Sequence, residues 1–121
     1  MLQLRGQRLT LEQIADVANG RERVALADEA RSRIEASRAV IERIVAEYRT
    51  VYGVNTGFGK LSDVRIDPDK LRELQLNLVR SHSCGLGNPL SEAEARAMLL
   101  LRANVMACGL SGARSSCRRW V

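Results

Sequence analysis

Apolar residues recur at helical spacing in four segments of the chain, and loops that contain glycine separate these segments. The first segment opens at a capping box, in which Thr10 is followed three residues later by Gln13. Apolar residues three apart follow at positions 11, 14 and 17, and Asn19-Gly20 is a helix stop signal. We therefore predict a short helix between Thr10 and Asn19, followed by an extended link over residues 23–26.

The second segment predicts a long helix from Asp28, as its N-terminal cap, to about Tyr48. Its apolar positions follow the helical period: Ile34, Ile41, Ile44, Val45 and Tyr48. The other face alternates arginine and glutamate, with Arg38 and Glu42 four residues apart. Such charges are typical of a solvated helix face, and we interpret them in this way.

Two further helices follow a glycine-rich segment. Asp67-Pro68 places an N-cap before a proline at the first helical position, and leucines continue the period to Val79. Ser91 and Glu94 form a second capping box, which opens a strongly apolar helix that ends at Gly109. Together the four segments indicate an all-α fold of about four helices.

The composition agrees with packed helices. Aromatic residues make up 3% of the 121 residues, which favours helices over a β-sandwich or barrel. No run approaches about eighteen consecutive apolar residues, the length that a membrane span requires. The first eight residues lack the apolar stretch of a signal peptide. We therefore expect a cytoplasmic protein that has no membrane partner.

The formal net charge is +5, and Arg118-Arg119 supplies two of the excess charges. Basic and acidic residues otherwise alternate, and a basic stripe with stacking aromatics is missing, so we expect no nucleic-acid partner. The three cysteines, Cys84, Cys108 and Cys117, include no C-x-x-C pair, and His82 is the single histidine. This pattern supports neither a disulfide framework nor a metal site.

The segment from Tyr52 to Lys60 has neither helical nor strand periodicity and contains three glycines. It fails the P-loop pattern, because Leu61 follows Gly59-Lys60 where Ser or Thr is required. It fails the dinucleotide fingerprint, because Ser62 stands where glycine is required. Two interpretations remain: an ordinary interhelical loop with Tyr52 packed in the core, or a loop whose glycines bring backbone close to a ligand.

The literal sequence from Tyr52 to Lys60 resembles the tyrosine loop of the histidine ammonia-lyase family, the lyases that use a methylidene-imidazolone group. The resemblance continues through four further stretches: Gln75–His82, Gly85–Gly87, Leu101–Val105 and Gly109–Arg114. It implies that residues 1–114 form an N-terminal helical domain like that of the ammonia-lyase/fumarase-like fold.

The resemblance also implies an activity, the deamination of L-histidine to trans-urocanate and ammonia in a homotetramer. It implies no added cofactor, because the family makes its electrophile by cyclisation of an Ala-Ser-Gly triplet. Tyr52 matches the loop tyrosine that transfers the β-proton, and it is the expected catalytic residue. His82 matches a histidine that receives the substrate side chain. Asn55, Thr56 and Gly59 line the same loop as expected substrate-binding residues.

The chain departs from the family pattern because its 121 residues contain no Ala-Ser-Gly triplet. The nearest sequences are Ala36-Ser37-Arg38 and Leu110-Ser111-Gly112. We therefore expect a chain that corresponds to about the first quarter of the enzyme and is inactive alone. Residues 115–121 no longer resemble the family, and for them we expect a disordered or frame-shifted tail.

Alternative interpretations remain open. A parent enzyme that acts on tyrosine or phenylalanine would use the same loop, although the His82 imidazole can hydrogen-bond and so favours a polar substrate side chain. In a second alternative, the chain is a non-catalytic binding or assembly module that docks on an intact lyase. His82 also has a structural interpretation, as a helix-end residue that contacts the last carbonyls.

Overall fold

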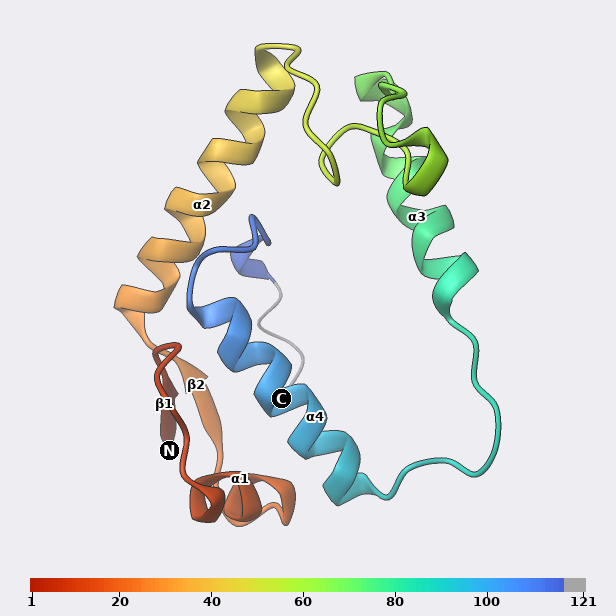
Figure 1. Ribbon diagram of the computed structural model, residues 1–121. Coiled ribbons are helices and arrows are strands. Elements are labelled where there is room, and N and C mark those ends of the chain that lie inside the picture. Colours follow the sequence, from red (N-terminus) through yellow and green to blue (C-terminus); the bar gives the residue numbers. More distant parts are fainter. Residues whose placement is uncertain (117–121) are drawn as a thin grey trace. The chain divides into compact units, whose positions relative to one another are not determined.

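The computed structural model describes residues 1–116 (Figure 1). The described residues form four α-helices: α1 (Leu11–Ala18), α2 (Asp28–Ala46), α3 (Leu71–His82) and α4 (Glu92–Ala107). They also form two strands, β1 (Leu2–Leu4) and β2 (Val24–Leu26), and two short 3₁₀ helices, Gly59–Leu61 and Pro68–Lys70. This mostly helical structure confirms the predicted fold class.

The chain divides into two compact units. The first comprises residues 1–40 with 89–121, and the second comprises residues 41–88. The tail that we expected at residues 115–121 lies outside the described residues from position 117 onward.

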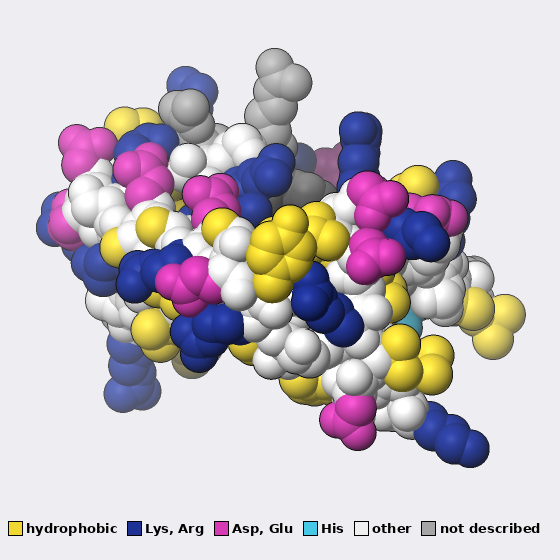
Figure 2. All heavy atoms as spheres, turned by 90° about the horizontal axis from the view of Figure 1, so that it is seen from above, with side chains coloured by type: hydrophobic (Ala, Val, Ile, Leu, Met, Phe, Trp, Pro, Cys, Tyr) yellow, Lys and Arg dark blue, Asp and Glu magenta, His cyan; other side chains and the backbone are white. Residues whose placement is uncertain are grey.

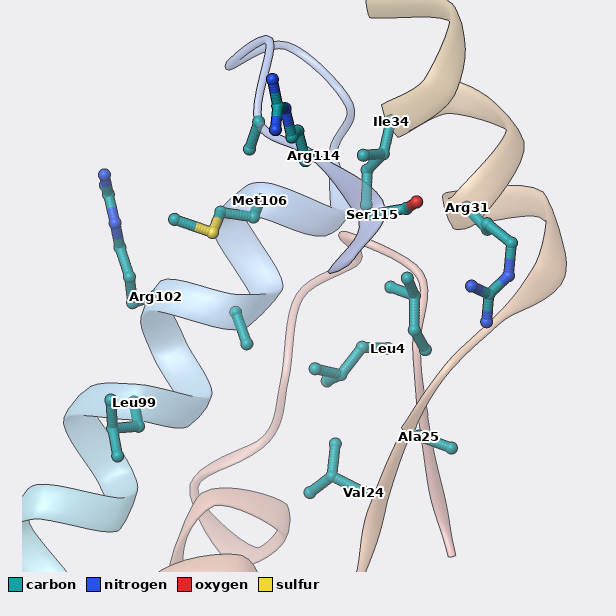
Figure 3. A pocket seen from close by; sticks show the side chains of 13 residues that line it. Leu4, Val24, Ala25, Arg31, Ile34, Leu99, Arg102, Met106, Arg114 and Ser115 are labelled. Atoms are coloured by element: carbon teal, nitrogen blue, oxygen red, sulfur yellow. The ribbon is translucent and has the colours of Figure 1, made fainter. Parts of the chain in front are cut away.

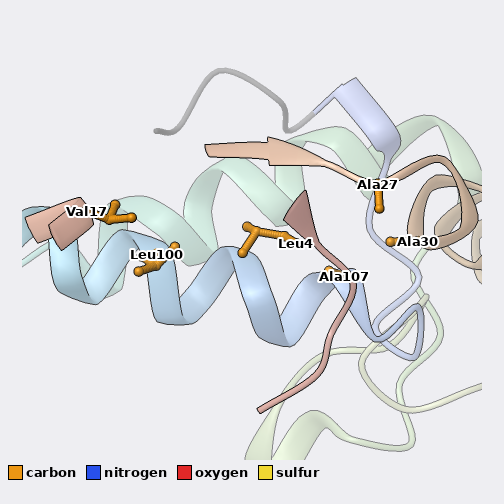
Figure 4. Close-up of a cluster of buried hydrophobic side chains, with 6 residues drawn as sticks. All are labelled: Leu4, Val17, Ala27, Ala30, Leu100 and Ala107. Carbon is orange, nitrogen blue, oxygen red and sulfur yellow. The ribbon is translucent and has the colours of Figure 1, made fainter. Parts of the chain in front are cut away.

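Six buried apolar side chains form the core of the first unit (Figure 4): Leu4, Val17, Ala27, Ala30, Leu100 and Ala107. Leu100 of α4 has no exposed surface. Helix α4 packs against α1 and β1, so the last α-helix of the described residues contacts the first elements (Figure 1). Burial of this apolar surface is the main force that stabilises the unit.

Strands β1 and β2 form a two-stranded parallel sheet, with Leu2 opposite Val24 and Leu4 opposite Leu26. A parallel pair needs a crossover connection, which α1 supplies here. The sequence predicted only an extended link at residues 23–26. Three residues are too few to display an alternating pattern, and the partner strand lies at the other end of α1.

Both predicted capping boxes are confirmed. Thr10 Oγ1 accepts the Gln13 N–H at 3.2 Å, and Gln13 Oε1 accepts the Thr10 N–H at 2.9 Å. At the start of α4, the Ser91 N–H donates to the Glu94 carboxylate at 2.8 Å, and the Glu94 N–H donates to Ser91 Oγ at 3.3 Å. These bonds satisfy backbone donors that a helix start leaves without partners.

Helix α2 differs from its prediction at both ends. Asp28 is its first residue rather than its cap, and the Asp28 carboxylate lies 3.9 Å from Arg31 within the first turn. The helix ends at Ala46, before Tyr48. Arg33 belongs to the face that we interpreted as solvated, but its guanidinium donates to the Ala107 carbonyl at 3.1 Å and so ties α2 to the end of α4.

The apolar face predicted for α1 is also narrower than its spacing suggested. Val17 is buried, whereas Leu11 is 86% exposed. In an α-helix, residues six positions apart point about 120° away from each other. Leu11 therefore faces away from α4 when Val17 faces towards it.

The second unit has a polar rather than an apolar interior. Its buried positions are Asn55, Thr56 and Gly57, all in the glycine-rich loop. The predicted cap Asp67 and the predicted first helical residue Pro68 open a 3₁₀ turn, Pro68–Lys70, so α3 begins at Leu71 rather than at Pro68, and none of its residues is fully buried. The order of this unit therefore depends on hydrogen bonds of the loop more than on packed apolar side chains.

The charged side chains are mixed over the surface. Figure 2 shows Lys and Arg interspersed with Asp and Glu on the face in view, without a continuous basic patch. Among the described residues, no helix is long and apolar enough to cross a membrane.

Candidate active site

The glycine-rich loop begins where α2 ends, at an unusual helix terminus. The Tyr48 N–H donates to the Val45 carbonyl at 3.2 Å, and the Arg49 N–H donates to the Ile44 carbonyl at 3.1 Å. This pair of bonds is a Schellman motif, and Tyr48 occupies its left-handed position with φ of 55°. The Arg65 guanidinium carbon lies 4.9 Å from the centre of the Tyr48 ring and covers it.

Tyr52 lies in a tight turn directly after this terminus. The Val54 N–H donates to the Val51 carbonyl at 3.1 Å, which closes a four-residue turn with Tyr52 at its second position. Gly53 follows with φ of 76°, the positive value that a type II turn requires at its third position. The Tyr52 side chain is 63% exposed. The structure therefore presents this phenol to solvent and does not pack it in a core.

Asn55 ties together the base of the Tyr52 turn. Its Oδ1 accepts the Val51 N–H at 2.9 Å, and its Nδ2 donates to the Arg49 carbonyl at 2.7 Å. The side chain of Asn55 is buried, with 3% of the residue exposed. A buried amide that is paired at both ends stabilises the backbone geometry around it, because an unpaired one would be costly.

The loop then pairs with the segment that precedes α3. The Ile66 N–H donates to the Asn55 carbonyl at 2.8 Å, and the Gly57 N–H donates to the Val64 carbonyl at 3.0 Å. Thr56 lies between these bonds, opposite Arg65 in an antiparallel bridge, and is 1% exposed. The Thr56 hydroxyl donates to the Gly57 carbonyl at 2.9 Å.

Gly57 allows the backbone to come close to Leu61. A Cβ at position 57 would lie 2.6 Å from the Leu61 Cβ and 2.8 Å from the Leu61 carbonyl oxygen. These distances are shorter than contacts in close-packed interiors permit. Gly59 is exposed, begins a 3₁₀ helix and has open space where a Cβ would lie.

His82 is the last residue of α3 and is exposed. Its Nδ1 lies 2.9 Å from both the Ser81 hydroxyl and the Leu78 carbonyl oxygen. The contact with a carbonyl of the last helical turn matches the structural interpretation of this histidine. Among the described residues, no hydrogen bond or ring contact joins His82 to the loop.

The structure therefore brings four of the five predicted site residues, Tyr52, Asn55, Thr56 and Gly59, into one ordered loop. Of these, Tyr52 and Gly59 are exposed, and Asn55 and Thr56 are buried. Sequence reasoning did not single out Tyr48 or Arg65. The sequence offered one signal for Tyr48. Neither glycine nor asparagine is present where α2 must end, so another residue type has to adopt the left-handed conformation there.

A cavity of about 560 Å³ lies in the first unit (Figure 3). Leu4, Leu99 and Met106 contribute to its apolar walls, and Arg31, Arg102 and Arg114 also line it. None of the predicted site residues lines this cavity. Within the described part of the chain, no group of three or more His, Cys, Asp or Glu side chains is placed to hold a metal ion, and Cys84 and Cys108 are free thiols.

Comparison with known proteins identifies relatives of nearly the whole chain. The model of the aromatic amino acid lyase family matches residues 9–119. A histidine ammonia-lyase of Geobacillus thermodenitrificans is 52% identical over 114 residues, which cover 94% of this chain and 23% of that protein. The family match extends beyond position 114, where we placed a boundary, and that boundary stays a prediction.

Solved structures of lyases and aminomutases also match nearly the whole chain. Histidine ammonia-lyase from Trypanosoma cruzi matches with a TM-score of 0.86 and 45% identity, over 95% of this chain and 22% of that one. Tyrosine aminomutase from Streptomyces globisporus matches with a TM-score of 0.87 and 39% identity, over 93% of this chain and 22% of that one. The chain thus spans less than a quarter of the length of these relatives.

Proposed function

The chain belongs to the aromatic amino acid lyase family, and from this membership we propose that it is part of an enzyme that deaminates L-histidine to trans-urocanate and ammonia. The observation that carries the proposal is the 52% identity to a protein named histidine ammonia-lyase, over a stretch that covers nearly all of this chain. The exposed Tyr52 in an ordered turn supports it, because a proton-transfer group must be both accessible and held in place.

The reaction requires two groups with different tasks. The β-hydrogen of an amino acid is barely acidic and ammonia is a poor leaving group, so an electrophile must activate the substrate while a base removes the proton. We assign the second task to Tyr52, whose phenol oxygen receives the β-proton. A phenol is a weak proton acceptor at neutral pH unless positive charge or donated hydrogen bonds stabilise its anion. In this proposal, other parts of the assembled enzyme supply that stabilisation.

The residues of this chain do not supply the electrophile of the family. No Ala-Ser-Gly triplet is present in the sequence. The nearest sequence, Leu110-Ser111-Gly112, makes hydrogen bonds to α2 through Gly112. The Gly112 N–H donates to Ser37 Oγ at 3.0 Å, and its carbonyl accepts a bond from Arg38 at 3.5 Å. We therefore propose that the 121 residues alone are inactive and that another part of a homotetrameric enzyme carries the electrophile.

The remaining predicted residues take supporting roles in this proposal. His82 Nδ1 is occupied by its own helix end, so its Nε2 is the nitrogen that meets the substrate side chain. Gly59 is exposed at the loop and lies against the substrate, whereas Asn55 and Thr56 support the loop from its buried side. An enzyme acting on tyrosine is the second candidate, because the tyrosine aminomutase match covers the same loop.

A chimaeric enzyme tests the proposed function. Residues 1–114 of this chain replace the matching segment of the Geobacillus thermodenitrificans enzyme, and urocanate formation from L-histidine is followed by absorbance. We expect turnover by the chimaera and none by the 121-residue chain under the same conditions. A chimaera that assembles like its parent but makes no urocanate contradicts the proposal. Faster turnover of L-tyrosine than of L-histidine would favour the second candidate.

A variant at His82 tests the substrate assignment. His82→Leu in the chimaera removes both ring nitrogens and puts an apolar side chain in place of the imidazole. We expect kcat/KM for L-histidine to fall relative to that for L-phenylalanine, because only the first substrate loses a hydrogen bond. An unchanged ratio would show that His82 does not meet the substrate side chain.

A further inference from the structure

The proposed function gives the buried Asn55 side chain a supporting role in the loop but no part in the chemistry. It makes one hydrogen bond on each side of its amide, to the Val51 N–H and to the Arg49 carbonyl, at 2.9 and 2.7 Å. Both partners lie just before Tyr52 in the chain, and Asn55 lies three residues after it. The amide therefore closes a ring of backbone that contains Tyr52.

The backbone groups of Asn55 extend this connection in the other direction. Its carbonyl accepts the Ile66 N–H at 2.8 Å, and its N–H donates to the Val51 carbonyl at 3.3 Å. A single residue thus joins the end of α2, the base of the Tyr52 turn and the segment before α3. Because 3% of Asn55 is exposed, water cannot easily replace these bonds.

We infer that Asn55 is a positioning residue, whose amide fixes the Tyr52 turn and thereby the place of the phenol oxygen. This inference rests on the proposed role of Tyr52 in proton transfer. It assigns Asn55 no contact with substrate, in contrast to the substrate-binding role that the resemblance implied. An amide is required because it combines a donor and an acceptor, whereas an aspartate carboxylate offers acceptors only.

Amide hydrogen exchange of the 121-residue chain tests whether the Asn55 amide fixes the Tyr52 turn, and this measurement does not require enzyme activity. In Asn55→Ala, the Val51 N–H loses its acceptor, and we expect its exchange to accelerate about five- to tenfold, the factor that corresponds to one net hydrogen bond. Asn55→Asp keeps an acceptor for the Val51 N–H but sets a carboxylate oxygen against the Arg49 carbonyl oxygen in a buried site, so we expect exchange at Val51 to accelerate in this variant as well. Asn88→Ala, which truncates an exposed asparagine of the same unit, is the matched control and should leave Val51 unchanged.

Steady-state kinetics of the chimaera separates positioning from substrate binding. If Asn55 positions Tyr52, Asn55→Ala lowers kcat about tenfold or more and changes KM by less than about twofold, because proton transfer is sensitive to small displacements. Asn55→Asp, whose carboxylate repels the Arg49 carbonyl, should also lower kcat and leave KM nearly unchanged. If Asn55→Ala does not fold, the kcat and KM of Asn55→Asp, compared with those of the Asn88→Ala control, still distinguish positioning from substrate binding.

Two results would overturn the inference. One is an unchanged Val51 exchange rate in Asn55→Ala. The other is a raised KM with an unchanged kcat, which would assign Asn55 to substrate binding. An inactive unsubstituted chimaera would instead contradict the proposed function. The exchange experiment would still report whether the Asn55 amide fixes the Tyr52 turn.

Discussion

The rings of Tyr52 and Phe58 meet edge to face, with their centroids 6.0 Å apart and their planes inclined by 72°. This is the favoured geometry for an aromatic pair, and it spans the two ends of the glycine-rich loop. The Tyr52 side chain therefore has an aromatic neighbour that restricts its rotation, although most of its surface is exposed.

Removing the Phe58 ring should loosen Tyr52. We expect Phe58→Ala to lower the free energy of unfolding of the 121-residue chain by about 1 kcal/mol, the usual size of such a pair. The Tyr52 ring protons should also shift towards random-coil positions in the NMR spectrum. Leu61→Ala, which truncates an exposed side chain at the end of the 3₁₀ helix that follows Phe58, serves as control and should leave those protons in place.

Gly57 should tolerate no side chain. Gly57→Ala places a methyl group 2.6 Å from the Leu61 side chain, and we expect a loss of about 1–3 kcal/mol in unfolding free energy. The matched control is Gly85→Ala, because nothing lies within 4 Å of a Cβ there and that position is exposed. Chemical denaturation of both variants measures the difference, and equal stabilities would contradict the close approach to Leu61.

Leu100 should dominate the stability of the first unit. Leu100→Ala removes a side chain with no exposed surface, and we expect a loss of about 2–5 kcal/mol. Leu101→Ala makes the same chemical change on the neighbouring residue, which is 46% exposed, and should cost much less. Thermal unfolding followed by circular dichroism compares the two, and a similar loss in both would refute the placement of α4.

The capping box of α4 should make stability depend on acid pH. Hydrogen bonds from Ser91 hold the pKa of Glu94 below its ordinary value, so its carboxylate favours the folded state. This contribution is complete above the ordinary glutamate pKa of about 4.3 and is lost as pH falls through the lowered folded value. Ser91→Ala should therefore destabilise the chain at pH 7 and lose much of that effect at low pH.

The other capping box provides the control for this prediction. Thr10 pairs with Gln13, which does not titrate, so Thr10→Ala should destabilise the chain equally at both pH values. Each cap should contribute about 1 kcal/mol at pH 7. Denaturant unfolding at neutral and acid pH measures both variants, and an equal pH dependence for the two would contradict the assignment to Glu94.

Local signals in the sequence predicted all four helices, and the two capping boxes also predicted where α1 and α4 begin. The residues of each capping box, such as Thr10 and Gln13, lie within one turn of each other, so sequence spacing alone defines their contact. The strand pair was missed for the opposite reason. Leu4 and Leu26 are far apart in sequence, and neither three-residue strand carries a pattern that identifies its partner.

For the candidate site too, the sequence predicted local features but not contacts that depend on the fold. The resemblance that begins at the string from Tyr52 to Lys60 indicated the family, which the family match confirms, but the string did not distinguish exposed from buried residues. Burial of Asn55 results from bonds to backbone groups of Arg49 and Val51, and side-chain types do not predict which backbone groups an amide will reach. The stacking of Arg65 on Tyr48 likewise depends on a bridge that only the fold creates.

The most direct test of the central claim compares two tyrosines of the same unit. Tyr52 is 63% exposed and Tyr48 is 62% exposed, so Tyr52→Phe and Tyr48→Phe remove the same hydroxyl group from similarly exposed side chains. The measurement is kcat for urocanate formation by the chimaera that carries residues 1–114. We predict that Tyr52→Phe lowers kcat by about 10²-fold or more while Tyr48→Phe stays within about twofold of the unsubstituted chimaera. Undiminished turnover in Tyr52→Phe would contradict the claim that this chain contributes the proton-transfer tyrosine of a lyase.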